Sequence, residues 1–403
     1  GLAVRYLVFF IYFASMIWSF GQETSWKSYF ISGNEFEWPK VVALESYDTS
    51  YVFSGTIRNP PDDNTKRIVL FKESQDSLHY CYSIKSAYGR TIVLEIIETD
   101  DKEILGSGYV ENGGSDKELY LFKVDSLGNL LWGKTYEGWG AVNGAMVRKS
   151  TISNDYYFGS SFNKRMGYAR IDSSGTILSG FRLEQEIGGS AIHVLEGDTI
   201  LLNSYSDEYS SGEIDIVVVK ADNEGGEVWT KSLGWSDRDE FQASVCPSVS
   251  GGYVIAGTSV KNEWSGPDDY DLFFCNLNYD GSTKWSRFYD VPNMTYVEEI
   301  IPYSDSAYLV YCRAKAETKP YFDYGLLLLD SVGNVLWSWM YSLDDGALGD
   351  DLTDVFVSKE DKIVLAGSNA VYGSAIDGAY LVELNKNGNM GCGQDYWPVI
   401  EED

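Results

Sequence analysis

Hydrophobic and polar positions alternate along this chain in short runs that end at glycine, and the clearest example spans residues 251–289. A run Gly-Gly-Tyr-Val-Ile-Ala-Gly-Thr-Ser is followed by a polar loop, then by Asp-Leu-Phe-Phe-Cys-Asn-Leu-Asn and by Lys-Trp-Ser-Arg-Phe-Tyr. Short runs rich in β-branched and aromatic residues and bounded by turn residues are typical of β-strands. We therefore expect three consecutive strands, the last two joined by a tight turn at Asp280 and Gly281.

The same phrase recurs along the chain. Its turn glycines, spaced 47 to 56 residues apart, are Gly128, Gly175, Gly225, Gly281, Gly333 and Gly388. A shortened copy at residues 70–80 brings the number of copies to seven. An Asp-Ser-x-Gly-Asn sequence between two strands predicts a hairpin in which Asp caps the turn and Gly takes the positive φ.

A second pair of strands precedes each copy. These pairs lie at residues 41–57, 92–110, 146–161, 192–205, 243–260, 297–312 and 352–368. Four strands per repeat and seven repeats predict an all-β fold, a seven-bladed β-propeller of four-stranded antiparallel blades. A β-solenoid has shorter coils, and a row of β-sandwiches has roughly seven strands per ~100 residues, so both alternatives fit less well.

Tryptophan recurs in the predicted fourth strands, at Trp132, Trp229, Trp285 and Trp337. A large ring at this position is expected to pack against the adjacent blade. Stacking on a sugar is the alternative, but a residue repeated in most blades is more economically explained as part of the core.

Both ends of the chain contain candidates for the strand that closes the ring. Residues Trp26, Lys27, Ser28, Tyr29 and Phe30 resemble the fourth-strand phrase and precede the first complete blade, so they are predicted to complete the last blade, whose other strands are residues 352–385. The competing segment, residues 390–396, contains Cys392 and Tyr396 but lacks the Trp and has gained two glycines. Either the ring closes within one molecule, with the C-terminal tail laid over the seam, or a terminal strand pairs with a neighbouring subunit and builds a polymer.

The chain divides into a segment at residues 1–22, the propeller at 23–390 and a C-terminal tail at 391–403. Arg5 followed by fifteen uncharged residues at 6–20 predicts a secretory signal peptide. The apolar run is short for a transmembrane helix, which needs about 20 residues. If the segment is retained, it is an anchor or an assembly element, and only then do we expect contact with a membrane.

Composition narrows the class of partner. Of 403 residues, 44% are hydrophobic and 15% aromatic, which is enough for a large packed core. The 60 acidic and 31 basic residues give a net charge of −29, and this repels phosphate backbones, so we expect no nucleic-acid partner. A soluble, self-repelling extracellular surface is the simplest interpretation, and bridging of carboxylates between molecules by divalent cations is the alternative.

Familiar catalytic motifs are absent from the sequence. The five cysteines form no Cys-x-x-Cys pair, which argues against a zinc or redox motif, and an odd number leaves at least one thiol unpaired. His79 and His193 lie in predicted strands, and neither Gly-x-Ser-x-Gly nor His-Glu-x-x-His occurs. Triad hydrolases and zinc proteases are therefore not expected, and no catalytic or cofactor-binding residue is assigned.

Acidic pairs are dispersed over the predicted loops. Catalysis of glycoside cleavage needs one convergent pair of carboxylates, so dispersal favours solvated turns or weak calcium sites. The densest group, Asp268, Asp269 and Asp271, is the first candidate for a calcium or glycan site. The alternative is an acidic loop in which Asp271 caps the start of a strand, and the equivalent positions of Asp215 and Asp323 favour this structural reading.

The repeated phrase, Gly-Gly-Tyr-x-x-x-Gly-Thr-Ser followed by Asp-x-Leu and Asp-x-x-Gly-x-x-x-Trp, resembles the β-propeller repeats of secreted bacterial proteins over residues 25–390. Such repeats are similar to those of quinone-dependent propellers. The resemblance implies an uncharacterised extracellular or cell-surface component. The chain lacks the adjacent Cys-Cys pair and the cofactor-binding residues of quinoprotein dehydrogenases, so the resemblance transfers no catalytic residue.

The sequence favours a secreted, non-enzymatic protein: a subunit of a cell-surface or filamentous assembly, or an adhesin. Its expected partners are copies of itself, other surface proteins or glycans, and it needs no cofactor apart from the calcium candidate. The alternative is a carbohydrate-active or other propeller enzyme with a carboxylate site at a channel mouth. A monomeric ligand-binding module is a third possibility.

Overall fold

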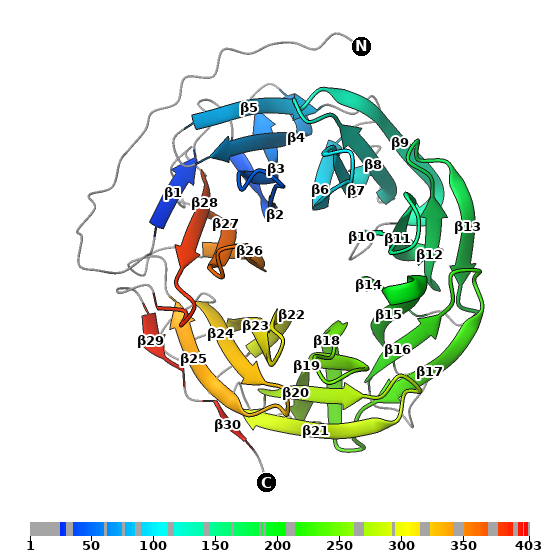
Figure 1. The fold of residues 1–403 in the computed structure, drawn as a ribbon, viewed down its shortest axis with the longest axis vertical. Helices are drawn as coiled ribbons and strands as arrows, with labels where there is room; N and C mark the ends of the chain where they lie inside the picture. Colours follow the sequence, from blue (N-terminus) through cyan, green and yellow to red (C-terminus); the bar gives the residue numbers. More distant parts are fainter. Residues whose placement is uncertain are drawn as a thin grey trace.

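The computed structural model describes residues 25–29, 35–59, 63–74, 77–84, 90–111, 117–140, 146–162, 165–184, 187, 191–206, 214–261, 270–291, 295–314, 323–341, 350–369, 378–389, 394–397 and 399–401. Seven blades, each built on four antiparallel strands, stand radially around a central axis (Figure 1), which confirms the predicted seven-bladed propeller. Among the described residues, no helix is long and apolar enough to cross a membrane.

Each blade runs from a first strand beside the axis to a fourth strand on the outer rim (Figure 1). The strands of blades 1 to 3 are β2 (Glu35–Glu45), β3 (Tyr51–Asn59), β4 (Asp63–Ser74) and β5 (Ser77–Ile84); β6 (Arg90–Glu98), β7 (Ile104–Glu111), β8 (Lys117–Val124) and β9 (Leu130–Gly140); β10 (Met146–Lys149), β11 (Tyr156–Phe162), β12 (Arg165–Ile171) and β13 (Ile177–Arg182). The end of β9 also pairs with β11, so blades 2 and 3 share one continuous sheet.

The other four blades follow the same order. Their strands are β14 (Ala191–Leu195), β15 (Thr199–Ser206), β16 (Asp215–Ala221) and β17 (Glu227–Leu233), with the 3-10 turn η1 (Glu196–Asp198); β18 (Arg238–Pro247), β19 (Tyr253–Lys261), β20 (Tyr270–Leu277) and β21 (Thr283–Asp290); β22 (Thr295–Ser304), β23 (Ala307–Ala314), β24 (Asp323–Asp330) and β25 (Val335–Tyr341); β26 (Asp350–Val357), β27 (Ile363–Asn369) and β28 (Gly378–Leu384), completed by β1 (Ser25–Tyr29).

The core lies between neighbouring blades. All eight residues of β20 are buried, because the blade before it covers one face and the blade after it covers the other. This explains why the third strands are continuous apolar runs and not alternating ones.

The hairpin between the third and fourth strands has the geometry that its sequence predicts. In blade 2 the amide of Gly128 donates to the carbonyl of Asp125 over 2.9 Å, and the amide of Asn129 donates to the Asp125 carboxylate over 2.8 Å. Gly128 has φ 84°, a conformation that side-chain-bearing residues rarely adopt. Asp125 therefore caps the turn and Gly128 supplies its positive φ, and in blade 7 the side chain of Asn385 caps the equivalent turn.

The fourth-strand tryptophans join one blade to the next, as the sequence predicts. A Cβ on the turn glycine Gly175 of blade 3 would lie 3.0 Å from the ring of Trp132 in blade 2, and Trp229, Trp285 and Trp337 approach the turn glycines of blades 5, 6 and 7 in the same way. The indole N–H of Trp132 donates to the carbonyl of Ser173, and the hydroxyl of Tyr136 donates to the carbonyl of Gly175 over 2.7 Å. We call this contact the outer joint.

The N-terminal strand β1 lies in the last blade, in the position that the sequence assigns to it. It pairs antiparallel with β28, with Trp26 opposite Val382 and Tyr29 opposite Ala379. Figure 1 shows β1, coloured blue, beside β28, coloured red, so the first described strand and the last blade close the ring. Phe30 and Cys392 lie outside the described residues.

The C-terminal tail does not lie over this seam, and that expectation is wrong. Its first strand, β29 (Gln394–Tyr396), pairs with the outer edge of β25 in blade 6, with Tyr396 opposite Trp339. Its second strand, β30 (Ile400–Glu401), pairs with the outer edge of β21 in blade 5. The tail thus runs backward around the rim and adds a fifth strand to two blades (Figure 1). We call residues 394–401 the strap.

Trp397 determines where the strap lies. Its side chain is 1% exposed and belongs to the core between blades 5 and 6. The ring fills space that Gly325 leaves open, since a Cβ there would lie 2.4 to 2.8 Å from atoms of the indole. Blade 5 has Phe273 at the equivalent position of its third strand, counted from the hairpin turn, so Gly325 distinguishes blade 6 from its neighbour.

The outer joint predicts a difference between two glycine substitutions. Gly175 and Gly197 have φ 78° and 72°, but only Gly175 has neighbours, because nothing lies within 4 Å of a Cβ on Gly197. Gly197→Ala is expected to lower the free energy of unfolding by about 1 kcal/mol through backbone strain, and Gly175→Ala by about 2–3 kcal/mol because crowding against Trp132 and Tyr136 adds to the strain. Urea denaturation of both variants measures the difference, and equal losses would contradict the joint.

Candidate functional site

Carboxylates on the innermost strands hold neighbouring blades together. The carboxylate of Glu95 in blade 2 accepts the amide of Val147 in blade 3 over 2.6 Å, and that of Asp354 in blade 7 accepts the amide of Ala43 in blade 1 over 2.7 Å. The register of each inner strand shifts next to its acidic residue. An extra residue re-aims a side chain in this way, so the bulge directs the carboxylate at the next blade.

We call the carboxylates on the innermost strands the inner ring, and Arg148 is a cation that lies beside them. It forms an ion pair with Glu95. Burial lowers the pKa of Arg148, but the attraction of Glu95, and of Glu299 and Asp354 from blades 6 and 7, outweighs burial and raises that pKa. Glu95 therefore has a fixed counter-charge, and Arg148 also attracts Glu299 and Asp354.

His193 lies beside this ring on the first strand of blade 4. Burial, with the charge of Arg148 acting in the same direction, lowers the pKa of His193 to about 3. The imidazole is neutral at physiological pH, so it is poorly matched to general acid catalysis there.

A second group of charges is buried at the junction of blades 4 and 5. Asp271 is 1% exposed and forms an ion pair with Arg238, whose guanidinium carbon lies 4.7 Å from the ring centre of Phe288. Asp271 is the second residue of β20, and its partner is a buried arginine. Asp215 and Asp323, at the equivalent positions, are also buried. Asp268 and Asp269 lie outside the described residues.

Glu240 belongs to the same junction and was not singled out from the sequence. Its carboxylate accepts the hydroxyl of Ser259 over 2.7 Å and the amide of Trp235 over 3.1 Å. One oxygen of Glu240 and one of Asp215 both lie within 2.6 Å of the place that a Cβ on Gly234 would take, so the two oxygens are less than about 5 Å apart. Burial, with the charge of Asp215 adding to it, raises the pKa of Glu240 to about 7. The one signal for this group in the sequence is that Arg238 and Glu240 are two residues apart at the start of a strand, so their side chains share a face.

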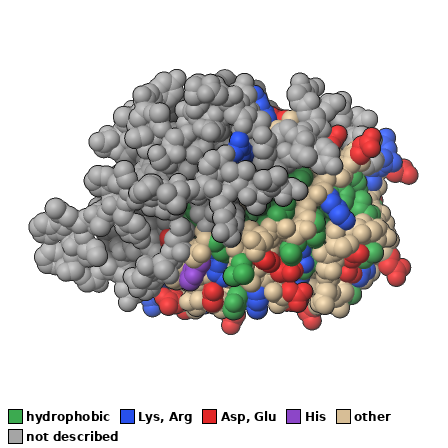
Figure 2. Space-filling view, turned by 90° about the horizontal axis from the view of Figure 1, so that it is seen from above, with side chains coloured by type: hydrophobic (Ala, Val, Ile, Leu, Met, Phe, Trp, Pro, Cys, Tyr) green, Lys and Arg blue, Asp and Glu red, His purple; other side chains and the backbone are tan. Residues whose placement is uncertain are grey.

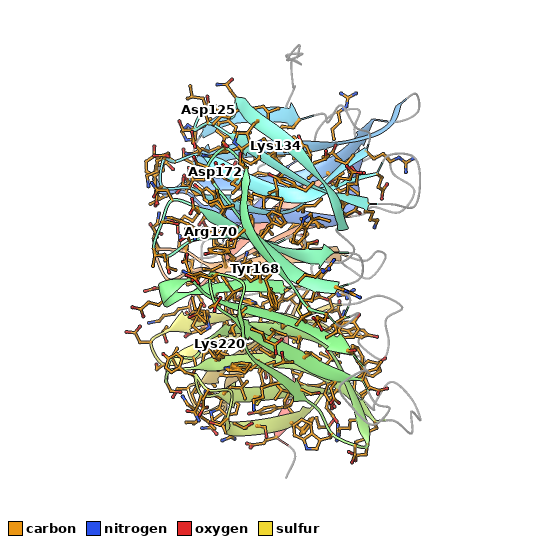
Figure 3. The ribbon with its side chains drawn as sticks, turned by 90° about the vertical axis from the view of Figure 1, so that its right-hand side faces the viewer. Asp125, Lys134, Tyr168, Arg170, Asp172 and Lys220 are labelled. Atoms are coloured by element: carbon orange, nitrogen blue, oxygen red, sulfur yellow. The ribbon has the colours of Figure 1, made fainter. Side chains whose placement is uncertain are left out.

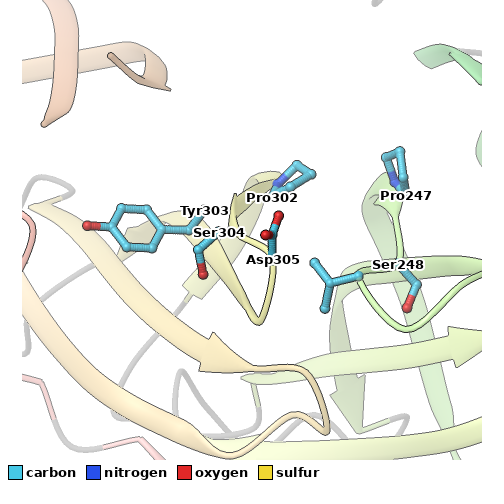
Figure 4. Close-up of a pocket in the computed structure, with 7 residues that line it drawn as sticks. Pro247, Ser248, Pro302, Tyr303, Ser304 and Asp305 are labelled. Carbon is cyan, nitrogen blue, oxygen red and sulfur yellow. The ribbon is translucent and has the colours of Figure 1, made fainter. Parts of the chain in front are cut away.

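A shallow pocket lies between the loops that follow the first strands of blades 5 and 6 (Figure 4). Pro247, Ser248 and Val249 line one side, and residues 302–305 line the other. Asp305 is the one carboxylate of the lining, and the lining contains no histidine or lysine to activate Ser248 or Ser304. The pocket therefore offers shape and hydroxyl groups, not a catalytic pair.

Metal-ligand geometry is lacking in the described ranges, where no three His, Cys, Asp or Glu side chains converge to hold a metal ion. The cysteines Cys246, Cys275 and Cys312 are free and buried. Burial raises the pKa of the Cys246 and Cys275 thiols, and that of Cys275 reaches about 12. A thiol is nucleophilic as its thiolate, so these side chains serve the core.

The raised pKa of Glu240 predicts a pH-dependent stability. A carboxyl group whose folded-state pKa exceeds its unfolded value favours folding while protonated, and that contribution is lost as the pH rises from about 4.5 through about 7. Glu240→Gln keeps the shape of the protonated group. We expect wild-type protein to lose up to about 3 kcal/mol of unfolding free energy relative to this variant across that window.

Parallel urea titrations of both proteins at several pH values measure this difference. The repulsion among the other acidic residues contributes equally to both proteins, so it cancels in the difference of their unfolding free energies. A constant difference between pH 4.5 and 7.5 would show that Glu240 titrates normally.

No family model matches the chain, and no curated protein matches its sequence. Among solved structures, a protein from Lactobacillus plantarum aligns with 88% of this chain and 100% of its own, at 10% identity and TM-score 0.49. A protein of unknown function from Dyadobacter fermentans covers 89% of this chain and 99% of its own, at 9% identity and TM-score 0.47. The NanB sialidase from Streptococcus pneumoniae covers 93% of this chain and 71% of its own, at 10% identity and TM-score 0.46. Likeness at this level carries no argument about function.

Proposed function

We propose that this protein is a non-enzymatic, secreted interaction protein: a subunit of a cell-surface or filamentous assembly, or an adhesin. The observation that carries the proposal is the strap, because the outer edges of two blades already bind an extended segment by strand pairing. Strand addition to an exposed edge is a general mode of peptide recognition. Its partners are copies of this chain, or other surface proteins or glycans.

The rim of blades 2 to 4 supports contact with proteins. On this side of the molecule, which Figure 3 faces, β9, β13 and β17 form the outermost layer. Large apolar side chains, 45 to 53% exposed, stand at the start of these strands: Leu130, Leu131, Ile177, Leu178 and Val228. Leu336 is exposed at the same position of blade 6, so the repeat itself exposes an apolar side chain at the start of the fourth strand, and those of blades 2 to 4 are the candidates for contact with proteins.

The mixture of side chains on the surface also suits contact with other proteins. Figure 2 shows acidic, basic and hydrophobic side chains interspersed over the described part of one face. A surface on which acidic, basic and hydrophobic groups alternate can make both polar and apolar contacts with another protein. This part of the surface lacks the continuous basic patch that nucleic acids need.

The carboxylates give less support to an enzyme. Glu95 and Asp354 accept amides of neighbouring blades, and Asp271 is paired with Arg238. A general acid or base must reach a substrate proton, and these groups are already engaged. Calcium binding at Asp268, Asp269 and Asp271 stays a prediction, and there a calcium ion has to displace the guanidinium of Arg238 from Asp271.

A propeller enzyme is the second candidate, and the pair formed by Glu240 and Asp215 favours it. Two carboxyl groups whose oxygens are less than about 5 Å apart, one of them with a raised pKa, resemble the close carboxyl pair of glycosidases that retain configuration. Both residues are buried, so a substrate reaches them only if the junction of blades 4 and 5 opens.

Electron microscopy of native material, together with light scattering of the purified chain, tests the proposal against this candidate. We expect oligomers or fibres, and no hydrolysis of a panel of glycosides. A uniform monomer whose glycoside hydrolysis disappears in Glu240→Gln would overturn the proposal and establish the enzyme.

A further inference from the structure

The strap contributes nothing to closing the ring. β1 and β28 already join the first and last described parts of the propeller. The strap pairs with blades 5 and 6, whereas the described residues that precede it, up to Asn389, belong to the last hairpin of blade 7. It can therefore leave its site without opening a blade or the ring.

The site that the strap occupies is a built slot. Gly325 supplies the hollow for the ring of Trp397, and a side chain at that position would collide with the indole. Ser338 is 2% exposed beneath the strap, its hydroxyl donates to the carbonyl of Trp397 over 2.5 Å, and its own carbonyl accepts the Trp397 amide over 3.4 Å. Ser338 thus binds the backbone of the segment, and the hollow at Gly325 binds its indole ring.

A charged contact adds to the antiparallel strand pairing that sets the direction of the strap. Arg287 of β21 donates to the carboxylate of Glu401 over 2.6 Å. Val399, between the two strands of the strap, packs against the same core as Trp397. The slot therefore selects an extended segment with a tryptophan followed, four residues later, by an acidic side chain.

The hold on the strap is incomplete. The pairing covers three residues of β29 and two of β30. The indole N–H of Trp397 is buried, and in the described part of the chain it has no acceptor. A buried N–H without an acceptor costs about 1–3 kcal/mol, so part of the gain from burying the ring is lost.

We infer that the slot on blades 5 and 6 is an exchangeable docking site and that its second occupant is the strap of another copy of this chain. The inference rests on the proposed function and names the contact through which copies assemble. An exchanged strap makes every contact that the intramolecular strap makes, so exchange needs no new surface. It is favoured where copies are concentrated, as on a cell surface, and where salt screens the repulsion between chains of net charge −29.

A mixing experiment tests the exchange. Gly325→Val blocks the slot and leaves the strap intact, whereas Trp397→Ala leaves the slot intact and removes the anchor of the strap. We expect each variant alone to be monomeric and an equimolar mixture to form a 1:1 complex, measured by size-exclusion chromatography with light scattering. A double variant that carries both substitutions should form no complex with either single variant, because that chain has neither slot nor anchor.

A second measurement keeps the test valid if Gly325→Val does not fold. Gly325→Ala serves in its place, since the added Cβ alone lies 2.4 Å from the indole. In addition, a fluorescent peptide with the sequence of residues 394–401 is titrated into Trp397→Ala and into the intact chain. We expect at least a tenfold tighter binding to Trp397→Ala, whose slot is vacant.

The outcomes separate this inference from the proposed function. A mixture that stays monomeric, or a peptide that does not distinguish the two proteins, overturns strap exchange. If native assemblies form equally well from either single variant, strap exchange falls and the proposed function stands on another surface. If no assembly forms from any protein, including the native one, the proposed function falls as well.

Discussion

The propeller depends on the outer joint, in which a fourth-strand tryptophan lies against the turn glycine of the next blade. The same glycine does two things: its positive φ makes the hairpin of its own blade, and its missing side chain admits the ring from the blade before. Tyr136, Tyr289 and Tyr341 then donate their hydroxyls to the carbonyls of these glycines. Because one residue fixes both the turn and the joint, the repeat cannot lose it without weakening two blades. Blade 3 shows the limit, since it lacks the tryptophan and approaches Gly225 through the carbonyl of Gly180 instead.

A second set of contacts near the axis explains why an acidic protein can close into a ring. Glu95 and Asp354 accept backbone amides of the next blade, and Asp198 accepts the amide of Thr151 over 2.6 Å and the hydroxyl of Tyr157 over 2.9 Å in blade 3. Burial disfavours the charged form of Asp198, but hydrogen bonds from Ser150, Thr151 and Tyr157 outweigh it and lower its pKa. A carboxylate that receives several donors is stable when buried. These three interior carboxylates therefore serve the architecture.

The fold could be predicted from the sequence because its determinants are local. Asp125 and Gly128 make one hairpin within a few residues, and repetition of that chemistry gives the blade count. The packing of Trp132 followed from its recurrence, and the structural role of Asp271 followed from the equivalent Asp215 and Asp323. The partners themselves did not follow, because Arg238 reaches Asp271, and Glu240 reaches Asp215, only after the blades are assembled. The strap shows the same limit: residues 390–396 are recognisable as a candidate strand, but neither their pairing with blade 6 nor the strand at residues 400–401 was predicted, because both depend on contacts such as that of Trp397 with Gly325, which form only in the folded protein.

β1 and the strap therefore have different structural roles. β1 pairs over five residues with β28 as the fourth strand of the last blade, so its loss would leave that blade with three strands. The strap adds strands to blades that are already complete, and it is held by one ring, one serine and one ion pair. An element that completes a fold is selected for permanence, whereas an element added to a completed fold is free to be selected for what it binds. That difference is the reason to look for the partner of this protein at the strap and not at the seam.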